Sequence, residues 1–186
     1  FEQPEAIARA LGHGARMNGN RIVLGGLDVN KALLSEVKHM VLTGCGTSMH
    51  AAELGAIIMR DLGCFDTTQV VDSAELNRTV MPRKSAGMIA VSQSGETKDV
   101  FRAVKLAQGL ESPVPVLSVV NTVGSLIART TGMGVYLNAG REHAVASTKA
   151  FSTQVTVLAL IALWFRQTRD ETDGLPTSSH SIEKKE

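Results

Sequence analysis

The stretch Met88-Ile89-Ala90-Val91-Ser92-Gln93-Ser94-Gly95-Glu96-Thr97 joins an apolar run to a helical pattern that starts near Lys98. This order predicts a buried strand that leaves through a Ser/Gly loop into a helix. Such a loop holds hydroxyls and backbone N–H groups at the positive end of the helix, where anions are stabilised. Because the loop contains no Lys or Arg, we predict a ligand held by neutral donors, as small phosphorylated metabolites often are.

A plainer interpretation of the same loop is helix capping. Ser94 would then be an ordinary N-cap, with Glu96 in the first turn. A cap uses one side-chain acceptor, whereas Ser92–Thr97 supplies three hydroxyls and one amide within six residues. The density of polar groups favours a binding loop.

Two further loops have similar chemistry. Thr43-Gly44-Cys45-Gly46-Thr47-Ser48 follows the apolar run 38–44, and its glycines permit a tight turn close to a ligand. It lacks the third glycine of the dinucleotide fingerprint, and the chain has no Walker pattern. The third loop, residues 144–150, precedes a long apolar helix. Each loop alone could be an ordinary cap, but three hydroxylated helix starts together predict one anion site.

Apolar runs and helical patterns alternate along the chain, which predicts a parallel sheet covered on both faces. We expect a three-layer α/β/α sandwich of flavodoxin-like type with a five-stranded parallel sheet. In such folds ligands lie at the carboxyl ends of the strands, near a topological switch point. The expected strands are 38–44, 68–71, 88–92, 114–119 and 135–137, and the expected helices are 3–11, 48–62, 97–109, 125–129 and 148–168.

Composition narrows the class of protein. The 186 residues suffice for one domain with an aliphatic core, because 44% are hydrophobic and only 4% aromatic. A net charge of +1 without a basic cluster argues against nucleic acid as the main partner. Cys45 and Cys64 have no metal-type spacing and fit a reduced, cytoplasmic protein, and no apolar run is long enough to span a membrane. We expect no metal and no cofactor.

The sequence supports catalytic residues less strongly than it supports the three binding loops. His50 lies three residues from Glu53 on an expected helix, and His143 with Glu142 adjoins the third loop. Packing, capping or exposure is the commoner outcome for such residues. Cys45 has no base beside it in sequence, so we do not interpret it as a nucleophile.

Four motifs occur in an order that resembles a known family. They are Cys45-Gly46-Thr47-Ser48, Ser92-Gln93-Ser94-Gly95-Glu96-Thr97, Asn121-x-x-Gly124-Ser125 and Val145-Ala146-Ser147-Thr148-Lys149-Ala150. Together they resemble the first sugar-isomerase (SIS) domain of glucosamine-6-phosphate synthases, the isomerising glutamine–fructose-6-phosphate amidotransferases. The resemblance covers residues 1–168, including a lead-in helix within 1–20, and leaves 169–186 as a polar linker or tail.

The resemblance implies roles for ten residues and a SIS-type sandwich. Residues that bind the sugar phosphate would be Thr47, Ser48, Ser92, Gln93, Ser94 and Thr97. Residues that line the sugar pocket would be Cys45, Gly46, Val145 and Ser147. No catalytic residue of the family has a counterpart here, because the isomerase base, the ring-opening histidine and the Schiff-base lysine lie elsewhere in the enzyme. Lys149 does not match the Schiff-base residue.

The implied parent enzyme makes glucosamine 6-phosphate and glutamate from fructose 6-phosphate and glutamine. Its partners would be a sugar phosphate (fructose, glucose or glucosamine 6-phosphate), a second copy in a homodimer, and the second SIS and glutaminase domains. Two alternatives remain: a stand-alone sugar-phosphate isomerase, with Glu53, Glu75 or Glu142 as base, and a non-catalytic sugar-phosphate sensor.

One segment departs from the family pattern. The family usually reads Ala-Gly-Pro-Glu-Ile-Gly-Val-Ala-Ser where this chain has residues 139–147, Ala-Gly-Arg-Glu-His-Ala-Val-Ala-Ser. Losing a proline and a glycine predicts a different loop conformation.

Overall fold

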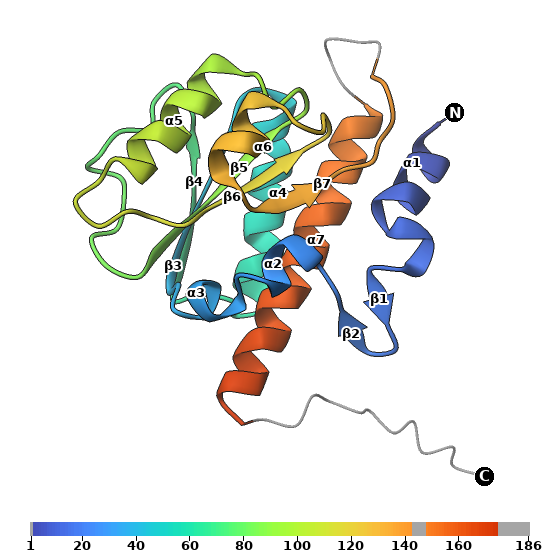
Figure 1. Cartoon of the computed structure of the whole chain (residues 1–186), viewed down its shortest axis with the longest axis horizontal. Coiled ribbons are helices and arrows are strands. Elements are labelled where there is room, and N and C mark those ends of the chain that lie inside the picture. The colour runs from blue at the N-terminus through green and yellow to red at the C-terminus, as the bar shows by residue number, and fades with distance from the viewer. Residues whose placement is uncertain (1, 143–147, 175–186) are drawn as a thin grey trace.

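A computed structural model describes residues 2–142 and 148–174, which fold into three layers around one parallel sheet (Figure 1). The sheet has the strand order β4-β3-β5-β6-β7, the flavodoxin-like order that the sequence predicts. Buried parallel strands read as near-continuous apolar runs, and all seven residues of β5 are buried. The strands are β3 (His39–Gly44), β4 (Thr67–Asp72), β5 (Ala86–Ser92), β6 (Val116–Val120) and β7 (Gly134–Tyr136).

Helices cover both faces of the sheet. One core layer lies under α4 (Thr47–Asp61) and α7 (Lys149–Thr172), which lie side by side. The other layer lies under α5 (Lys98–Gln108) and α6 (Leu126–Thr131). The prediction of a covered parallel sheet with an aliphatic core is therefore confirmed.

The closing helix is longer than expected. It ends at Thr172 rather than Thr168 because its polar last turns are held by the domain. Arg169 donates to the backbone oxygen of Cys64 at 2.8 Å and also to that of Val37. Glu171 pairs with Lys31 and Arg21, and the hydrogen bond from Lys31 is the main cause that lowers the Glu171 pKa. Among the described residues, no helix combines the length and apolarity needed to cross a bilayer.

The N-terminal region packs against α7. The lead-in helix α1 (Gln3–Ala10) is confirmed, and α1 lies along the start of α7 (Figure 1). The expected strands and helices leave residues 12–35 unassigned, and in the structure this part of the chain forms five short elements. These are a 3₁₀ turn (Gly12–Gly14), the antiparallel strands β1 (Met17–Asn18) and β2 (Arg21–Ile22), and the helices α2 (Gly25–Asp28) and α3 (Lys31–Ser35).

Candidate functional site

The chain reverses its direction across the sheet between β3 and β5. Strand β4 follows β3 on one side of it, whereas β5 returns to the other side. Connections leave in opposite directions there, which defines the topological switch point where ligands bind in open α/β sheets. The predicted loops 44–48 and 92–97 both leave the sheet at this point, at the carboxyl ends of the paired strands β3 and β5.

The hydroxyls after β5 are linked to one another. The backbone N–H of Gly95 donates to Ser92 Oγ at 3.0 Å, and Ser92 Oγ lies 3.0 Å from Thr97 Oγ1. A hydroxyl group can accept and donate at the same time, so Ser92 can accept from Gly95 and donate to Thr97. In that arrangement the Thr97 hydroxyl proton is available to a ligand. Ser92 is buried while Thr97 is half-buried, so Thr97 is the outer end of this chain of hydrogen bonds.

The capping interpretation of Ser94 is wrong. Helix α5 begins at Lys98, and its N-cap position is Thr97. Ser94 Oγ instead accepts from the backbone N–H of Glu96 at 3.1 Å, inside the loop. Within the described part of the chain the Thr97 side chain makes no capping bond, so the first N–H groups of α5 are not occupied by it.

The tip of this loop is fixed to the start of α6. Gly95 has φ +68°, and its carbonyl oxygen accepts from the backbone N–H of Ile127 at 2.9 Å. A Cβ atom at Gly95 would lie 2.0 Å from Ser125 Oγ. Glu96 Oε1 accepts from the backbone N–H of Leu126 at 2.8 Å. These contacts hold the loop rigid, which a preorganised binding loop requires.

The loop after β3 presents its hydroxyls from the first turn of α4. Gly46 is at the N-cap position, followed by Thr47 and Ser48. Thr47 is half-buried, and Ser48 is buried, where its Oγ accepts from Nε2 of Gln154 in α7 at 2.9 Å. The first turn of α4 therefore contacts the second turn of α7 at this edge of the sheet.

Cys45 is half-buried in the same loop. Burial is the main cause that raises the pKa of its thiol, with a further increase from the carboxylates of Asp72 and Asp99 and a partial decrease from a hydrogen bond with Ser73. The thiol is therefore protonated near neutral pH, which agrees with the interpretation that Cys45 is not a nucleophile.

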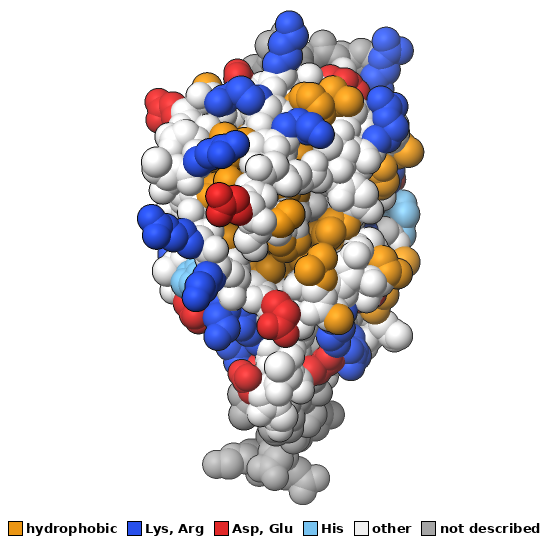
Figure 2. Space-filling view, turned by 60° about the vertical axis from the view of Figure 1, so that its left-hand side comes forward, with side chains coloured by type: hydrophobic (Ala, Val, Ile, Leu, Met, Phe, Trp, Pro, Cys, Tyr) orange, Lys and Arg blue, Asp and Glu red, His pale blue; other side chains and the backbone are white. Residues whose placement is uncertain are grey.

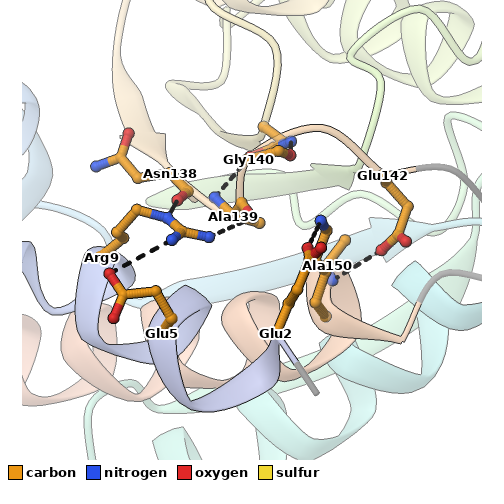
Figure 3. A network of polar contacts seen from close by, with 10 residues as sticks. Glu2, Glu5, Arg9, Asn138, Ala139, Gly140, Glu142 and Ala150 are labelled. Carbon is orange, nitrogen blue, oxygen red and sulfur yellow. Dashed lines mark hydrogen bonds and ion pairs between the residues drawn. The ribbon is translucent and has the colours of Figure 1, made fainter.

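The segment after β7 is held from two sides, as Figure 3 shows. Arg9 in α1 donates through Nε to the oxygen of Asn138 and through Nη2 to that of Ala139, both at 3.0 Å. The side chain of Asn121, which follows β6, donates to the oxygen of Gly140 at 2.7 Å and accepts from the N–H of Ala139 at 2.9 Å. The lead-in helix thus helps to place the segment that runs toward α7.

At the start of α7, Lys149 is buried and forms an ion pair with Glu2. Glu142 Oε2 accepts from the backbone N–H of Ala150 at 3.2 Å (Figure 3). The expected pocket residues Val145 and Ser147, and the weaker candidate His143, lie outside the described residues.

Two of the carboxylates that a stand-alone isomerase would need are exposed. Glu53 pairs with His50 at 3.0 Å on the outer surface of α4, and Glu75 lies in an exposed turn after β4. Both side chains are open to solvent, and neither is enclosed in a cleft as a general base would be.

Sequence reasoning missed three residues that support the site: Arg9, Glu96 as the partner of α6, and Gln154. The first two act through contacts between distant segments, which no local pattern shows. Gln154 carries no clear signal either, because it follows Ser152 and Thr153 in sequence, yet the structure leaves it 0% exposed.

These features define a flavodoxin-like α/β domain with a hydroxyl-rich loop, held against α6, at its switch point. The SIS domain family matches residues 33–164, and the chain belongs to this family.

Relatives agree with this assignment. The chain is 42% identical to a protein of Acanthamoeba polyphaga mimivirus named "Probable glutamine--fructose-6-phosphate aminotransferase [isomerizing]", over 88% of this chain and 26% of that protein. It is 38% identical to the "Glutamine--fructose-6-phosphate aminotransferase [isomerizing]" of Chlorobaculum tepidum, with the same coverage. The chain thus spans about a quarter of the length of these relatives.

Among solved structures, the chain is similar to the "C-terminal domain of glucosamine-fructose-6-phosphate aminotransferase" from Francisella tularensis. The TM-score is 0.80 with 27% identity, and the match covers 91% of this chain and 46% of that one.

Proposed function

We propose that this chain is the sugar-phosphate-binding domain of a glucosamine-6-phosphate synthase, which converts fructose 6-phosphate and glutamine to glucosamine 6-phosphate and glutamate. The observation that carries the proposal is the chain of hydrogen bonds from Gly95 through Ser92 to Thr97 at the switch point. Neutral donors at helix N-termini suit a phosphate group. The names of the relatives support the particular enzyme.

In this proposal the ten residues divide by position. The phosphate is bound from two helix starts by Thr47, Ser48, Gln93, Ser94 and Thr97, with Ser92 oriented behind them. Cys45, Gly46, Val145 and Ser147 line the sugar pocket. Such a clamp holds a part of the substrate that does not react, so it contributes positioning rather than proton transfer. The groups that carry out the chemistry would come from the second SIS and glutaminase domains.

A calorimetric titration tests the proposal. We expect the chain to bind fructose 6-phosphate and glucose 6-phosphate, and to bind neither fructose nor inorganic phosphate as tightly, because the site recognises both parts of the ligand. We expect no glutamine hydrolysis and no sugar interconversion in the same samples. Equal or tighter binding of ATP or NAD would contradict the proposed ligand class, and sugar turnover would favour the stand-alone isomerase.

We also propose a homodimer. Leu54 and Ile57 on α4 and Leu163 on α7 are 42%, 46% and 43% exposed, and these two helices are neighbours. Light scattering is expected to give about twice the chain mass of 19.8 kDa. A mass of one chain at every concentration would contradict this assembly.

Location and domain limits complete the proposal. Cys45 and Cys64 are free thiols, which suits the cytoplasm. A disulfide between them in protein isolated from cells would contradict this location.

Acidic and basic side chains are interspersed on the face in Figure 2, which favours a small-molecule ligand over nucleic acid. We propose 1–168 as the domain and 169–186 as a polar linker or tail, although residues 169–172 continue α7 and contact the domain through Arg169 and Glu171.

A further inference from the structure

Helix α7 approaches α4 closely enough for their side chains to meet beside the anion site. A Cβ atom at Gly55 of α4 would lie 2.9 Å from Leu158 Cβ of α7, so only glycine permits this approach. Gln154 lies one helical turn before Leu158, and Ser48 lies two turns before Gly55. Both helices therefore begin at the same edge of the sheet, as Figure 1 shows.

The contact between these helix starts is directional. Gln154 is 0% exposed, Ser48 is 7% exposed, and Gln154 Nε2 lies 2.9 Å from Ser48 Oγ. An amide nitrogen donates and cannot accept, so Ser48 Oγ is the acceptor in this hydrogen bond. The Ser48 hydroxyl proton therefore points toward a group other than Gln154. Among the described groups, no acceptor for that proton is found, and Ser48 stands in the first turn of α4 at the switch point.

The other end of the amide indicates that packing alone does not explain Gln154. Its Oε1 atom is buried and has no hydrogen-bond partner in the described part of the chain. Burying an unsatisfied acceptor destabilises a fold, and an apolar side chain of the same volume avoids that cost. Stability alone therefore does not account for an amide side chain at this position between α4 and α7.

We propose that Gln154 is a positioning residue for ligand binding: its amide fixes the Ser48 hydroxyl with the proton directed toward the phosphate of the bound sugar. The inference rests on the proposed function, because it takes the ligand to be a sugar phosphate. Gln154 acts through Ser48 and does not itself touch the ligand. Helix α7 thereby contributes to a site whose hydroxyls come from α4 and the loop before α5.

The test is a double-mutant cycle on the full 186-residue chain with fructose 6-phosphate as the titrant. In the presence of Ser48, Gln154→Met is expected to weaken binding about fivefold, the effect of losing one neutral hydrogen bond. In the Ser48→Ala background the same change is expected to have no further effect, because the group that Gln154 orients is gone. Urea unfolding is expected to show little change in stability for Gln154→Met.

The matched control is Thr153→Val. Thr153 is the adjacent buried residue, and its hydroxyl donates within the helix to Ala150, so binding should stay at the parent value. Gln154→Leu provides a second apolar side chain if methionine does not fold.

Additive effects of Gln154→Met and Ser48→Ala, or unchanged binding by both apolar variants, would overturn this inference and leave the proposed function standing. Failure of the unchanged chain to bind fructose 6-phosphate would overturn both.

Discussion

Thr97→Val is expected to weaken the binding of fructose 6-phosphate by about 10- to 100-fold, the effect of losing a hydrogen bond to a charged oxygen. Thr97 Oγ1 is the outer end of the hydrogen-bond chain that starts at the Gly95 N–H. Valine has nearly the same shape, and the Thr97 side chain makes no capping bond in the described structure, so α5 should form normally. Calorimetry measures the affinity, and urea unfolding checks the fold.

Thr67→Val is the matched control for this change. Thr67 begins β4 at the amino edge of the sheet, opposite the site, and its Oγ1 lies 2.9 Å from His39 Nδ1. The same chemical change there should leave affinity unaltered. If the two valine variants bind the sugar phosphate equally well, Thr97 is not a phosphate donor.

The sheet and its long helices could be predicted because their signals are local. Each strand of a covered parallel sheet is apolar on both faces, so 88–92 is recognisable as a buried run without knowledge of its neighbours. The turn residues that follow mark the helix starts. Alternation of these patterns then limits the topology to a parallel sheet with crossovers.

The elements within residues 12–35 could not be predicted, because contacts with α7 define them. The indole Nε1 of Trp164 donates to Asp28 Oδ1 at 2.7 Å, and the N–H of Ile22 donates to Gln167 Oε1 at 2.9 Å. Helices as short as α2 and α3 have too few residues to show a period. The last turns of α7 depend on the same region, since Glu171 pairs with Lys31.

The candidate site was predictable as a set of residues but not as an arrangement. The sequence places Ser92, Ser94 and Thr97 in one loop, yet it does not show that Ser92 is buried, that Ser94 closes a turn within the loop, and that Thr97 faces outward. These differences arise from the path of the backbone at Gly95, which contacts with α6 fix. The support from Gln154 likewise requires the packing of two helices that are distant in sequence.

Gly95→Ala is expected to lower the free energy of unfolding by about 3 kcal/mol and to abolish measurable sugar-phosphate binding. A left-handed backbone costs a residue with a Cβ atom about 1–2 kcal/mol, and Gly95 has φ +68°. Overpacking costs about 1–3 kcal/mol more, since the new Cβ would lie 2.0 Å from Ser125 Oγ. Relieving that contact must move the Gly95 N–H away from Ser92 and so disturb the hydroxyls behind the ligand.

Gly124→Ala separates these two causes. Gly124 has φ +70°, but a Cβ atom there would have nothing within 4 Å. It therefore carries the backbone strain alone, and its cost should stay near 1–2 kcal/mol. Ser125→Gly in the Gly95→Ala chain should recover part of the lost stability, because it removes the atoms that clash. Equal destabilisation by the two alanine variants, without recovery from Ser125→Gly, would show that the loop is not held against α6. The rigid placement of Ser92 and Thr97 would then need another cause.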